Sequence, residues 1–143
     1  EVSEKSIKGL HILLAEDNEL NMEIAEFMLQ NEGADVTKAW NGQEAVELFE
    51  KSRAGEFDVI LMDIMMPVMN GYDATKTIRS LDREDAKEVP IIAMTANAFT
   101  EDRIRAKEAG MDEHIAKPVD AKLLVKVIHK LVDWRKILSE GDS

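Results

Sequence analysis

The stretch Ile12-Leu13-Leu14-Ala15-Glu16-Asp17 is a short apolar run that ends in two acidic residues. Three later runs follow the same pattern, because each also ends at a polar side chain. They are Val59-Ile60-Leu61-Met62 before Asp63, Ile91-Ile92-Ala93-Met94 before Thr95, and His114-Ile115-Ala116 before Lys117-Pro118. Short continuous apolar runs are typical of strands that are buried on both faces of a parallel sheet. The pattern therefore predicts parallel strands with reactive residues at one edge.

Helical patterns separate these predicted strands. Asn18 or Asp17 can cap a first helix, and Asn41 with Glu44 resembles a capping box at the start of a second. Further helices are expected at 72–81, at 100–109 and after Pro118, and a charged connector is expected at 82–88. The apolar residues at helical spacing are Leu20, Ile24, Phe27 and Met28 in the first helix, and Leu123, Leu124, Val127, Ile128 and Leu131 in the last.

Five strand-helix units of this kind predict an α/β fold. Right-handed crossovers place the helices on both faces of a parallel sheet, which gives a doubly wound, five-stranded, flavodoxin-like (βα)5 arrangement. The second strand, at 34–39, contains Asp35 and Lys38 and is expected at an edge. We predict the strand order 2-1-3-4-5. This order brings the ends of the first and third strands together, at the switch point where such sheets bind ligands.

The composition is that of one soluble globular domain. The chain has 143 residues, of which 45% are hydrophobic and 33% charged. We expect a polar leader or linker at 1–8, the folded domain at 9–134 and a C-terminal tail at 135–143. The net charge of −11 opposes direct binding to nucleic acid. The apolar runs are too short to span a membrane, and the chain contains no cysteine, so we expect a cytoplasmic segment.

The predicted edge brings together Glu16, Asp17 and Asp63, with Thr95 and Lys117 nearby. Neighbouring carboxylates repel one another unless a cation offsets their charge, and carboxylate oxygens are good ligands for Mg²⁺. Lys117 and the Thr95 hydroxyl can meet phosphate oxygens. Each residue alone also has an ordinary explanation, such as the polar end of a strand or a surface lysine. We expect a cis peptide bond at Lys117-Pro118, which is possible at modest cost before proline.

Four segments together resemble the receiver domains of two-component response regulators. The resemblance covers about residues 9–132, and the combination in this order is specific. The segments are Ile12-Leu13-Leu14-Ala15-Glu16-Asp17-Asn18, Asp63-Ile64-Met65-Met66-Pro67-Val68-Met69-Asn70-Gly71, Met94-Thr95-Ala96-Asn97-Ala98 and Lys117-Pro118.

The resemblance implies a phosphoacceptor site. Asp63 would accept a phosphoryl group from a phosphohistidine, while Lys117 contacts that group. The metal site would consist of Glu16, Asp17, Asp63 and the backbone carbonyl of Met65, with Mg²⁺ as the ion and Mn²⁺ as a possible substitute. Thr95 would act as a switch whose hydroxyl moves toward the phosphoryl group, and the backbone amide of Ala96 would donate to it.

One position departs from the family pattern. Many receivers carry Tyr or Phe three residues before the lysine, as an aromatic switch, whereas this chain has His114. An imidazole can rotate in the same way, but its charge depends on pH near neutrality. His114 is therefore either a modified switch or an ordinary half-exposed strand residue.

The stretch from Ala15 to Asn21 looks most like receivers fused to hybrid sensor histidine kinases. Expected partners are then a histidine kinase, a histidine phosphotransfer protein or both, and a parent kinase could be anchored in a membrane. A stand-alone response regulator is the alternative. An aspartate-nucleophile phosphohydrolase is less favoured, because haloacid-dehalogenase-like phosphatases place a second Asp where this chain has Met65. A docking module without phosphorylation is disfavoured by the intact acidic set. Oligomeric state is left open.

Overall fold

The computed structural model describes residues 7–96 and 100–141, with side chains as far as residue 132. Within these ranges one parallel sheet has the strand order β2-β1-β3-β4-β5, which confirms the prediction. The strands are β1 (His11–Ala15), β2 (Asp35–Ala39), β3 (Val59–Asp63), β4 (Ile91–Thr95) and β5 (Glu113–Ala116).

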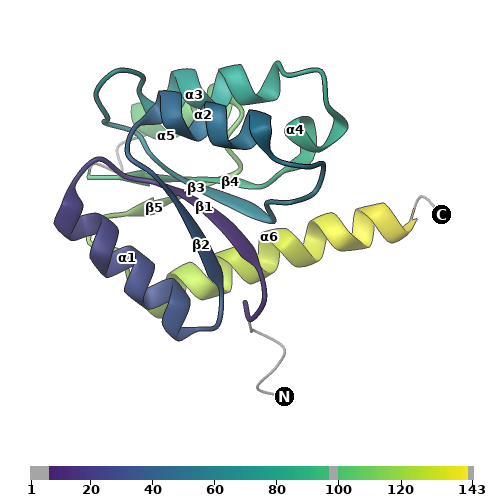
Figure 1. Ribbon diagram of the computed structural model, residues 1–143, viewed down its shortest axis with the longest axis horizontal. Helices are drawn as coiled ribbons and strands as arrows, with labels where there is room; N and C mark the ends of the chain where they lie inside the picture. The colour runs from purple at the N-terminus through teal and green to yellow at the C-terminus, as the bar shows by residue number, and fades with distance from the viewer. Residues whose placement is uncertain (1–6, 97–99, 142–143) are drawn as a thin grey trace.

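Helices cover both faces of the sheet, as a doubly wound fold requires. Figure 1 shows α1 and α6 on one face and α2, α3 and α5 on the other. The helices are α1 (Glu19–Asn31), α2 (Gly42–Lys51), α3 (Gly71–Arg79), α4 (Glu84–Glu88), α5 (Thr100–Ala109) and α6 (Ala121–Gly141). None of the helices in the described ranges combines the length and apolarity that crossing a bilayer would need.

The central strands separate two apolar layers. All five residues of β3 are buried, and so are all five of β4, which explains their continuous apolar sequences. Along β3 the side chains alternate between layers. Ile60 and Met62 pack with α2, α3 and α5, whereas Val59 and Leu61 pack with α1 and α6. β2 lies at the edge of the sheet, as its charged residues predicted, and it is mostly exposed or half-buried.

The charged connector predicted at 82–88 contains the short helix α4, which the sequence analysis did not predict. Ala86 is fully buried there, and the Arg83 side chain before the helix donates to Asp85 and to the carbonyl of Phe49. α3 ends at Arg79, two residues before the predicted end. The charged sequence gives no sign of the contact between Arg83 and Phe49, because the two residues lie 34 positions apart along the chain.

The buried face of α1 also differs from the apolar series noted in the sequence. Its buried residues are Met22, Ala25 and Leu29. By contrast, Leu20 and Phe27 are 64% and 70% exposed. Both series have helical spacing, so the period alone could not decide which one faces the sheet. α1 therefore presents an apolar surface to solvent.

The packed part of the chain reaches at least as far back as Ile7. This side chain is fully buried in the layer that contains α1 and α6. Its carbonyl accepts a hydrogen bond from the amide of Leu10 at 3.1 Å. Ile7 thus packs with the domain although it precedes Gly9, where the sequence placed the start of the fold.

Candidate functional site

The end of β1 directs Glu16 toward the end of β3. Ala15 pairs in register with Met62, so the next residues along the two strands, Glu16 and Asp63, are neighbours. The amide of Glu16 also donates to the carbonyl of Ala39 at 3.0 Å, which continues the β1–β2 ladder by one residue. Parallel register at the switch point therefore brings together acidic residues that are far apart in the sequence.

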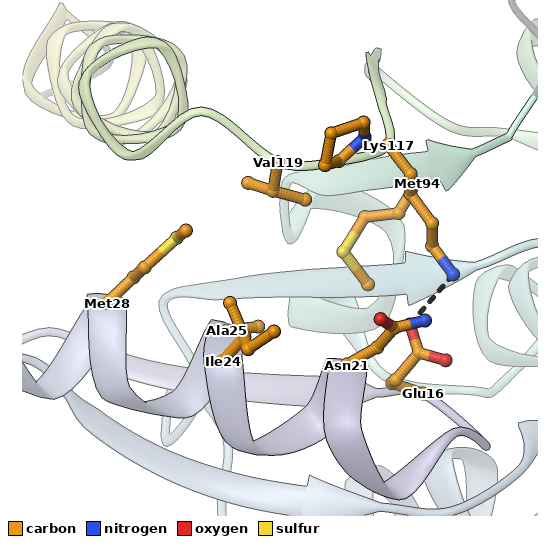
Figure 2. A pocket seen from close by; sticks show the side chains of 9 residues that line it. Glu16, Asn21, Ile24, Ala25, Met28, Met94, Lys117 and Val119 are labelled. Carbon is orange, nitrogen blue, oxygen red and sulfur yellow. Dashed lines mark ion pairs between the residues drawn. The ribbon is translucent and has the colours of Figure 1, made fainter.

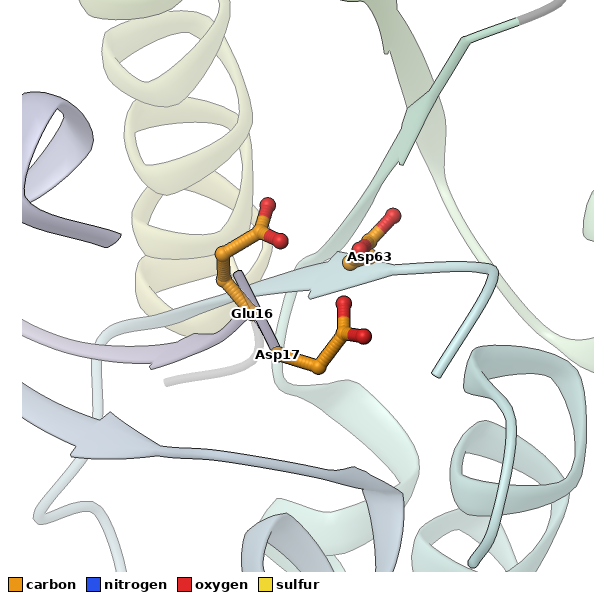
Figure 3. A group of neighbouring side chains, drawn as sticks. All are labelled: Glu16, Asp17 and Asp63. Carbon is orange, nitrogen blue, oxygen red and sulfur yellow. The ribbon is translucent and has the colours of Figure 1, made fainter. Parts of the chain in front are cut away.

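Three carboxylates meet at this edge of the sheet. Ligand oxygens of Glu16, Asp17 and Asp63 all lie within 4.8 Å of one another. Figure 3 shows the three side chains converging from two strand ends. Glu16 and Asp63 are only 2% and 3% exposed, whereas Asp17 is exposed. Because hard divalent cations prefer several carboxylate oxygens, this group suits such an ion.

Lys117 compensates two of the carboxylates directly. Its Nζ lies 2.8 Å from Oε1 of Glu16 and 3.1 Å from Oδ2 of Asp63. The second oxygen of Glu16 accepts a hydrogen bond from the backbone amide of Asn18 at 3.0 Å. The predicted cis peptide bond at Lys117-Pro118 is confirmed.

Charge at this edge remains only partly compensated. Burial and the neighbouring Glu16 raise the pKa of Asp63 to about 7, against the opposing effect of Lys117. Burial acts to lower the pKa of Lys117, but its hydrogen bond to Glu16 and the charge of Asp63 outweigh burial and raise it. The lysine therefore stays charged, while Asp63 would benefit from a second cation.

Thr95 lies at the adjacent end of β4. It is 8% exposed, and its carbonyl accepts a hydrogen bond from the amide of Lys117 at 2.8 Å. Ala96 follows and is exposed. Met65 lies two residues after Asp63 with its side chain 78% exposed. The roles predicted for the Thr95 hydroxyl, the Ala96 amide and the Met65 carbonyl stay predictions.

The loop from β3 to α3 is held in an unfavourable conformation. Val68 has a φ of 69°, and the amide of Met69 donates to the carbonyl of Pro67 at 2.7 Å. This is a γ-turn of the rare positive-φ kind, in which a β-branched residue is strained. The loop also packs against a glycine of α2, because a Cβ at Gly42 would lie 2.3 Å from the Met69 carbonyl oxygen. Packing, rather than local preference, fixes this loop.

His114 lies on β5 and does not belong to the group formed by Glu16, Asp17 and Asp63. Its Nδ1 is 3.7 Å from Glu113, and it lines a polar cavity of about 360 Å³ together with Arg103 and Lys107 of α5. A switching role for His114 stays a prediction.

Sequence reasoning missed Asn21, which borders the site from α1. Asn21, Glu16 and Lys117 line one end of a mostly apolar cavity of about 110 Å³ between α1 and the loop after β5. Figure 2 shows the Asn21 amide beside the Glu16 carboxylate, with Met28 and Val119 farther along the cavity. Asn18 caps α1 by accepting from the Asn21 amide, which places Asn21 in the first helical turn. Its position three residues after a capping asparagine was the available signal.

Comparison with known proteins agrees with this geometry. Residues 12–129 match the family model for the response regulator receiver domain. A histidine kinase of Arabidopsis thaliana, Histidine kinase 1, is 36% identical over 90% of this chain, which spans 13% of that protein. Hybrid signal transduction histidine kinase M of Dictyostelium discoideum is 43% identical over 85% of this chain, which spans 5% of its length. The chain thus spans a small part of these relatives.

A solved structure supports the same relationship. The receiver domain of a sensor histidine kinase from Pseudomonas aeruginosa, with a magnesium ion coordinated in its active site cleft, is 41% identical. The match has a TM-score of 0.79 and covers 87% of this chain and 98% of that one. Together with the family match and the strand order, it identifies this chain as a member of the response regulator receiver domains of two-component phosphorelay signalling, homologous to the receiver regions of hybrid histidine kinases.

Proposed function

We propose that Asp63 is the phosphoacceptor and that it takes the phosphoryl group from a phosphohistidine. The observation that supports this most directly is a nearly buried carboxylate at a strand end with Lys117 Nζ 3.1 Å away. Two further carboxylates have oxygens within 4.8 Å of it. A carboxylate can serve as a nucleophile when the charge of the incoming phosphate is offset in this way.

The reaction transfers one phosphoryl group between two side chains. An Asp63 oxygen forms a bond to phosphorus as the bond from phosphorus to the donor imidazole nitrogen breaks, and the imidazole leaves with the bonding electrons. Lys117 contacts the phosphoryl oxygens and offsets their charge. Glu16, Asp17, Asp63 and the Met65 carbonyl would hold Mg²⁺, which supplies further positive charge when bound; Mn²⁺ is proposed as a substitute.

The acyl phosphate on Asp63 then acts as a switch. It adds negative charge and acceptor oxygens at the end of β3. The Thr95 hydroxyl and the Ala96 amide, at the end of the neighbouring β4, donate to these oxygens. Movement of Thr95 shifts the population of the segment that follows, without a change of fold.

A hybrid sensor histidine kinase is the proposed source of this receiver, since the relatives described above include proteins of that kind. A histidine kinase or a histidine phosphotransfer protein is then the partner, in the cytoplasm. The exposed apolar side chains of α1 offer a docking surface beside the site, because Leu20, Ile24 and Phe27 are 64%, 46% and 70% exposed. A stand-alone regulator would use the same chemistry.

Intact-protein mass tests the phosphoacceptor role. The wild-type chain, incubated with Mg²⁺ and acetyl phosphate or phosphoramidate, is expected to gain one base-labile phosphoryl group. Asp63→Asn should gain none, because an amide is not a nucleophile toward phosphorus under these conditions. Omission of the metal should greatly reduce the adduct.

Two controls sharpen the test. Asp58→Asn changes a carboxylate at the other end of β3, where Asp58 accepts from the amide of His11, and it should leave the adduct unchanged. An equal adduct in wild type and in Asp63→Asn would contradict the assignment. Continued release of inorganic phosphate from many donor molecules per chain would favour the phosphohydrolase instead.

A further inference from the structure

The polar cavity of about 360 Å³ between α5 and β5 is lined by charges of both signs. Arg103 and Lys107 reach it from α5, whereas Asp112 and Glu113 lie at the start of β5, beside His114. None of the residues around this cavity belongs to the acidic site at the end of β3. Which of the charges are available to a ligand depends on how each one is already paired.

The two acidic residues of the cavity have partners within the domain. The carboxylate of Asp112 lies 3.0 Å from Nη2 of Arg79. One oxygen of Glu113 accepts a hydrogen bond from the amide of His114 at 3.2 Å, and the other lies 3.9 Å from Nζ of Lys130. Neither Arg79 nor Lys130 lines the cavity, so the negative charge of its wall is offset from outside.

The two basic residues of the cavity have no such compensation. Arg103 and Lys107 are exposed, and neither forms an ion pair or a side-chain hydrogen bond with residues 7–96 or 100–132. They lie four positions apart on α5 and are therefore neighbours on the helix surface, where like charges repel. No acidic residue lies three or four positions from either of them in the sequence. The wall that α5 contributes is thus positively charged.

The acidic residues of α5 surround a different cation. Glu101, Asp102 and Glu108 each lie three or four positions from Arg105, which is the spacing of neighbours on a helix. The guanidinium carbon of Arg105 also lies 4.5 Å from the ring centroid of Tyr72. Charge is therefore segregated on this helix, with compensation around Arg105 and none around the two cations at the cavity.

An anion in the cavity would relieve the repulsion between Arg103 and Lys107. A phosphate group suits this pair, because a guanidinium binds two phosphate oxygens in parallel and an ammonium adds a compact charge. The imidazole of His114 has an N–H donor in either protonation state. The net charge of −11 repels anions at long range, but the screening length is about 8 Å at physiological ionic strength. Charges close to the cavity therefore have the largest effect on a bound anion.

We propose that this cavity binds a small phosphate-bearing molecule of nucleotide size, with its phosphate between Arg103 and Lys107. The volume of about 360 Å³ falls in the range of roughly 300–1,000 Å³ that is typical of small-molecule sites, and a free phosphate ion would leave most of it unfilled. Ala106 and Met111 supply apolar wall for the organic part of the ligand. The inference does not depend on phosphorylation of Asp63.

Amide chemical shifts of the isotope-labelled chain test the site. Adenosine monophosphate and uridine monophosphate are titrated separately at neutral pH and constant ionic strength, with EDTA present to remove divalent cations. Saturable shifts are expected at 103–107 and 111–114, without comparable shifts at Glu16 or Asp63. Inorganic phosphate should shift the same amides but bind about tenfold more weakly, because it lacks the organic part. Adenosine, which has no phosphate, should give no saturable shift.

Three variants with the same change of charge locate the binding groups. Arg103→Gln and Lys107→Gln should each weaken binding of the nucleotides about tenfold, since each removes a charge-assisted contact. Arg105→Gln is the matched control on the same helix, because its guanidinium lies against Tyr72 and does not line the cavity. It should change the affinity by less than about twofold. All three positions are exposed, and a melting curve verifies that each variant is folded.

Four results would overturn the proposal. Equal weakening by Arg103→Gln and Arg105→Gln would mean that anions are attracted to the helix in general. Equal affinity for inorganic phosphate and for the nucleotides would mean an adventitious ion only. Absence of saturable shifts with both nucleotides would exclude the site. A dimer of the nucleotide-free chain that Arg103→Gln dissociates in sedimentation would assign this face to a second copy. None of these results affects the phosphoacceptor role of Asp63, which intact mass tests separately.

Discussion

At the carboxyl end of the sheet two nearly buried carboxylates share one lysine, whereas at the amino end one arginine serves one carboxylate and several carbonyls. Lys117 lies within 3.1 Å of both Glu16 and Asp63. Arg83 pairs with Asp85 at 2.8 Å and also donates to carbonyls that end α2, including those of Phe49 and Ser52. The carboxyl end thus has one positive charge for two carboxylates. At the amino end, one positive charge has one carboxylate and several neutral carbonyl acceptors.

The fold shifts the pKa values of Asp63 and Asp85 in opposite directions. Burial and Glu16 raise the pKa of Asp63 to about 7. Burial acts to raise the pKa of Asp85 as well, but its hydrogen bonds from Arg83 and from the amide of Gly55 outweigh burial and lower it. Aspartate therefore destabilises the fold at the carboxyl end of the sheet, where Asp63 is the proposed phosphoacceptor, and stabilises it at the amino end, where Asp85 lies.

Arg83→Ala should have the largest effect on stability. It removes the partner of Asp85, a carboxylate that is 11% exposed, together with the donors to the end of α2. We expect a loss of about 3 kcal/mol in the free energy of unfolding, measured by urea denaturation. Arg53→Ala, at an exposed position nearby, should change it by less than about 0.5 kcal/mol. Similar losses in both variants would remove the contrast between the two ends.

Asp63→Asn should instead stabilise the metal-free protein, by about 2 kcal/mol at pH 8 in the presence of EDTA. The folded-state pKa of about 7 lies above the ordinary value of 3.8, so the native state binds the extra proton. The wild type therefore loses stability as the pH rises from about 4 to about 7, and the advantage of the Asp63→Asn variant grows over the same range. Denaturation of the wild type and of Asp63→Asn at several pH values measures this difference in stability.

Asp85→Asn is the opposite control for that series. Because the pKa of Asp85 is lowered in the fold, its contribution is present above pH 3.8 and is lost as the pH falls through the folded-state pKa. This variant should be less stable than wild type at neutral pH, with a difference that shrinks in acid. A matching sign for the two variants at pH 8 would show that the two aspartates are not in contrasting environments.

Thr75→Val should give the smallest change. The substitution keeps the shape of a side chain that is fully buried but removes a hydroxyl with no described partner. We expect a gain of up to about 1 kcal/mol in urea denaturation. Thr77→Val is the control, because its hydroxyl donates to the Asp73 carbonyl at 2.8 Å, and it should give no gain. A loss for Thr75→Val would mean that the hydroxyl is satisfied in solution.

Much of the fold could be predicted from short apolar runs. Strands such as Val59–Asp63 and Ile91–Thr95 are buried on both faces, so their sequences show no polar alternation. Their order then placed Glu16 beside Asp63, as the register confirms. Asn41 also caps α2 as predicted, although the Glu44 side chain accepts from the amide of Trp40 rather than from that of Asn41.

The rest depended on contacts between distant segments. Arg79 binds Gly110 and Asp112, which lie 31 and 33 residues away, and no local pattern signals such partners. On α1, Met22 and Phe27 both belong to helical series, and only docking against the sheet decides that Met22 is buried. Asn21 was missed for a related reason, since its place beside Glu16 follows from where α1 crosses the edge of the sheet.

The strained turn at Val68 has a consequence for protein engineering. The loop of β3–α3 adopts its shape because its carbonyl at Met69 accepts from the amide of Gly42 at 3.0 Å and because a side chain at residue 42 has no room. A transplant of residues 63–71 alone into a foreign scaffold would release the turn into a relaxed geometry. A portable version of the β3–α3 loop has to include the first turn of α2 as well.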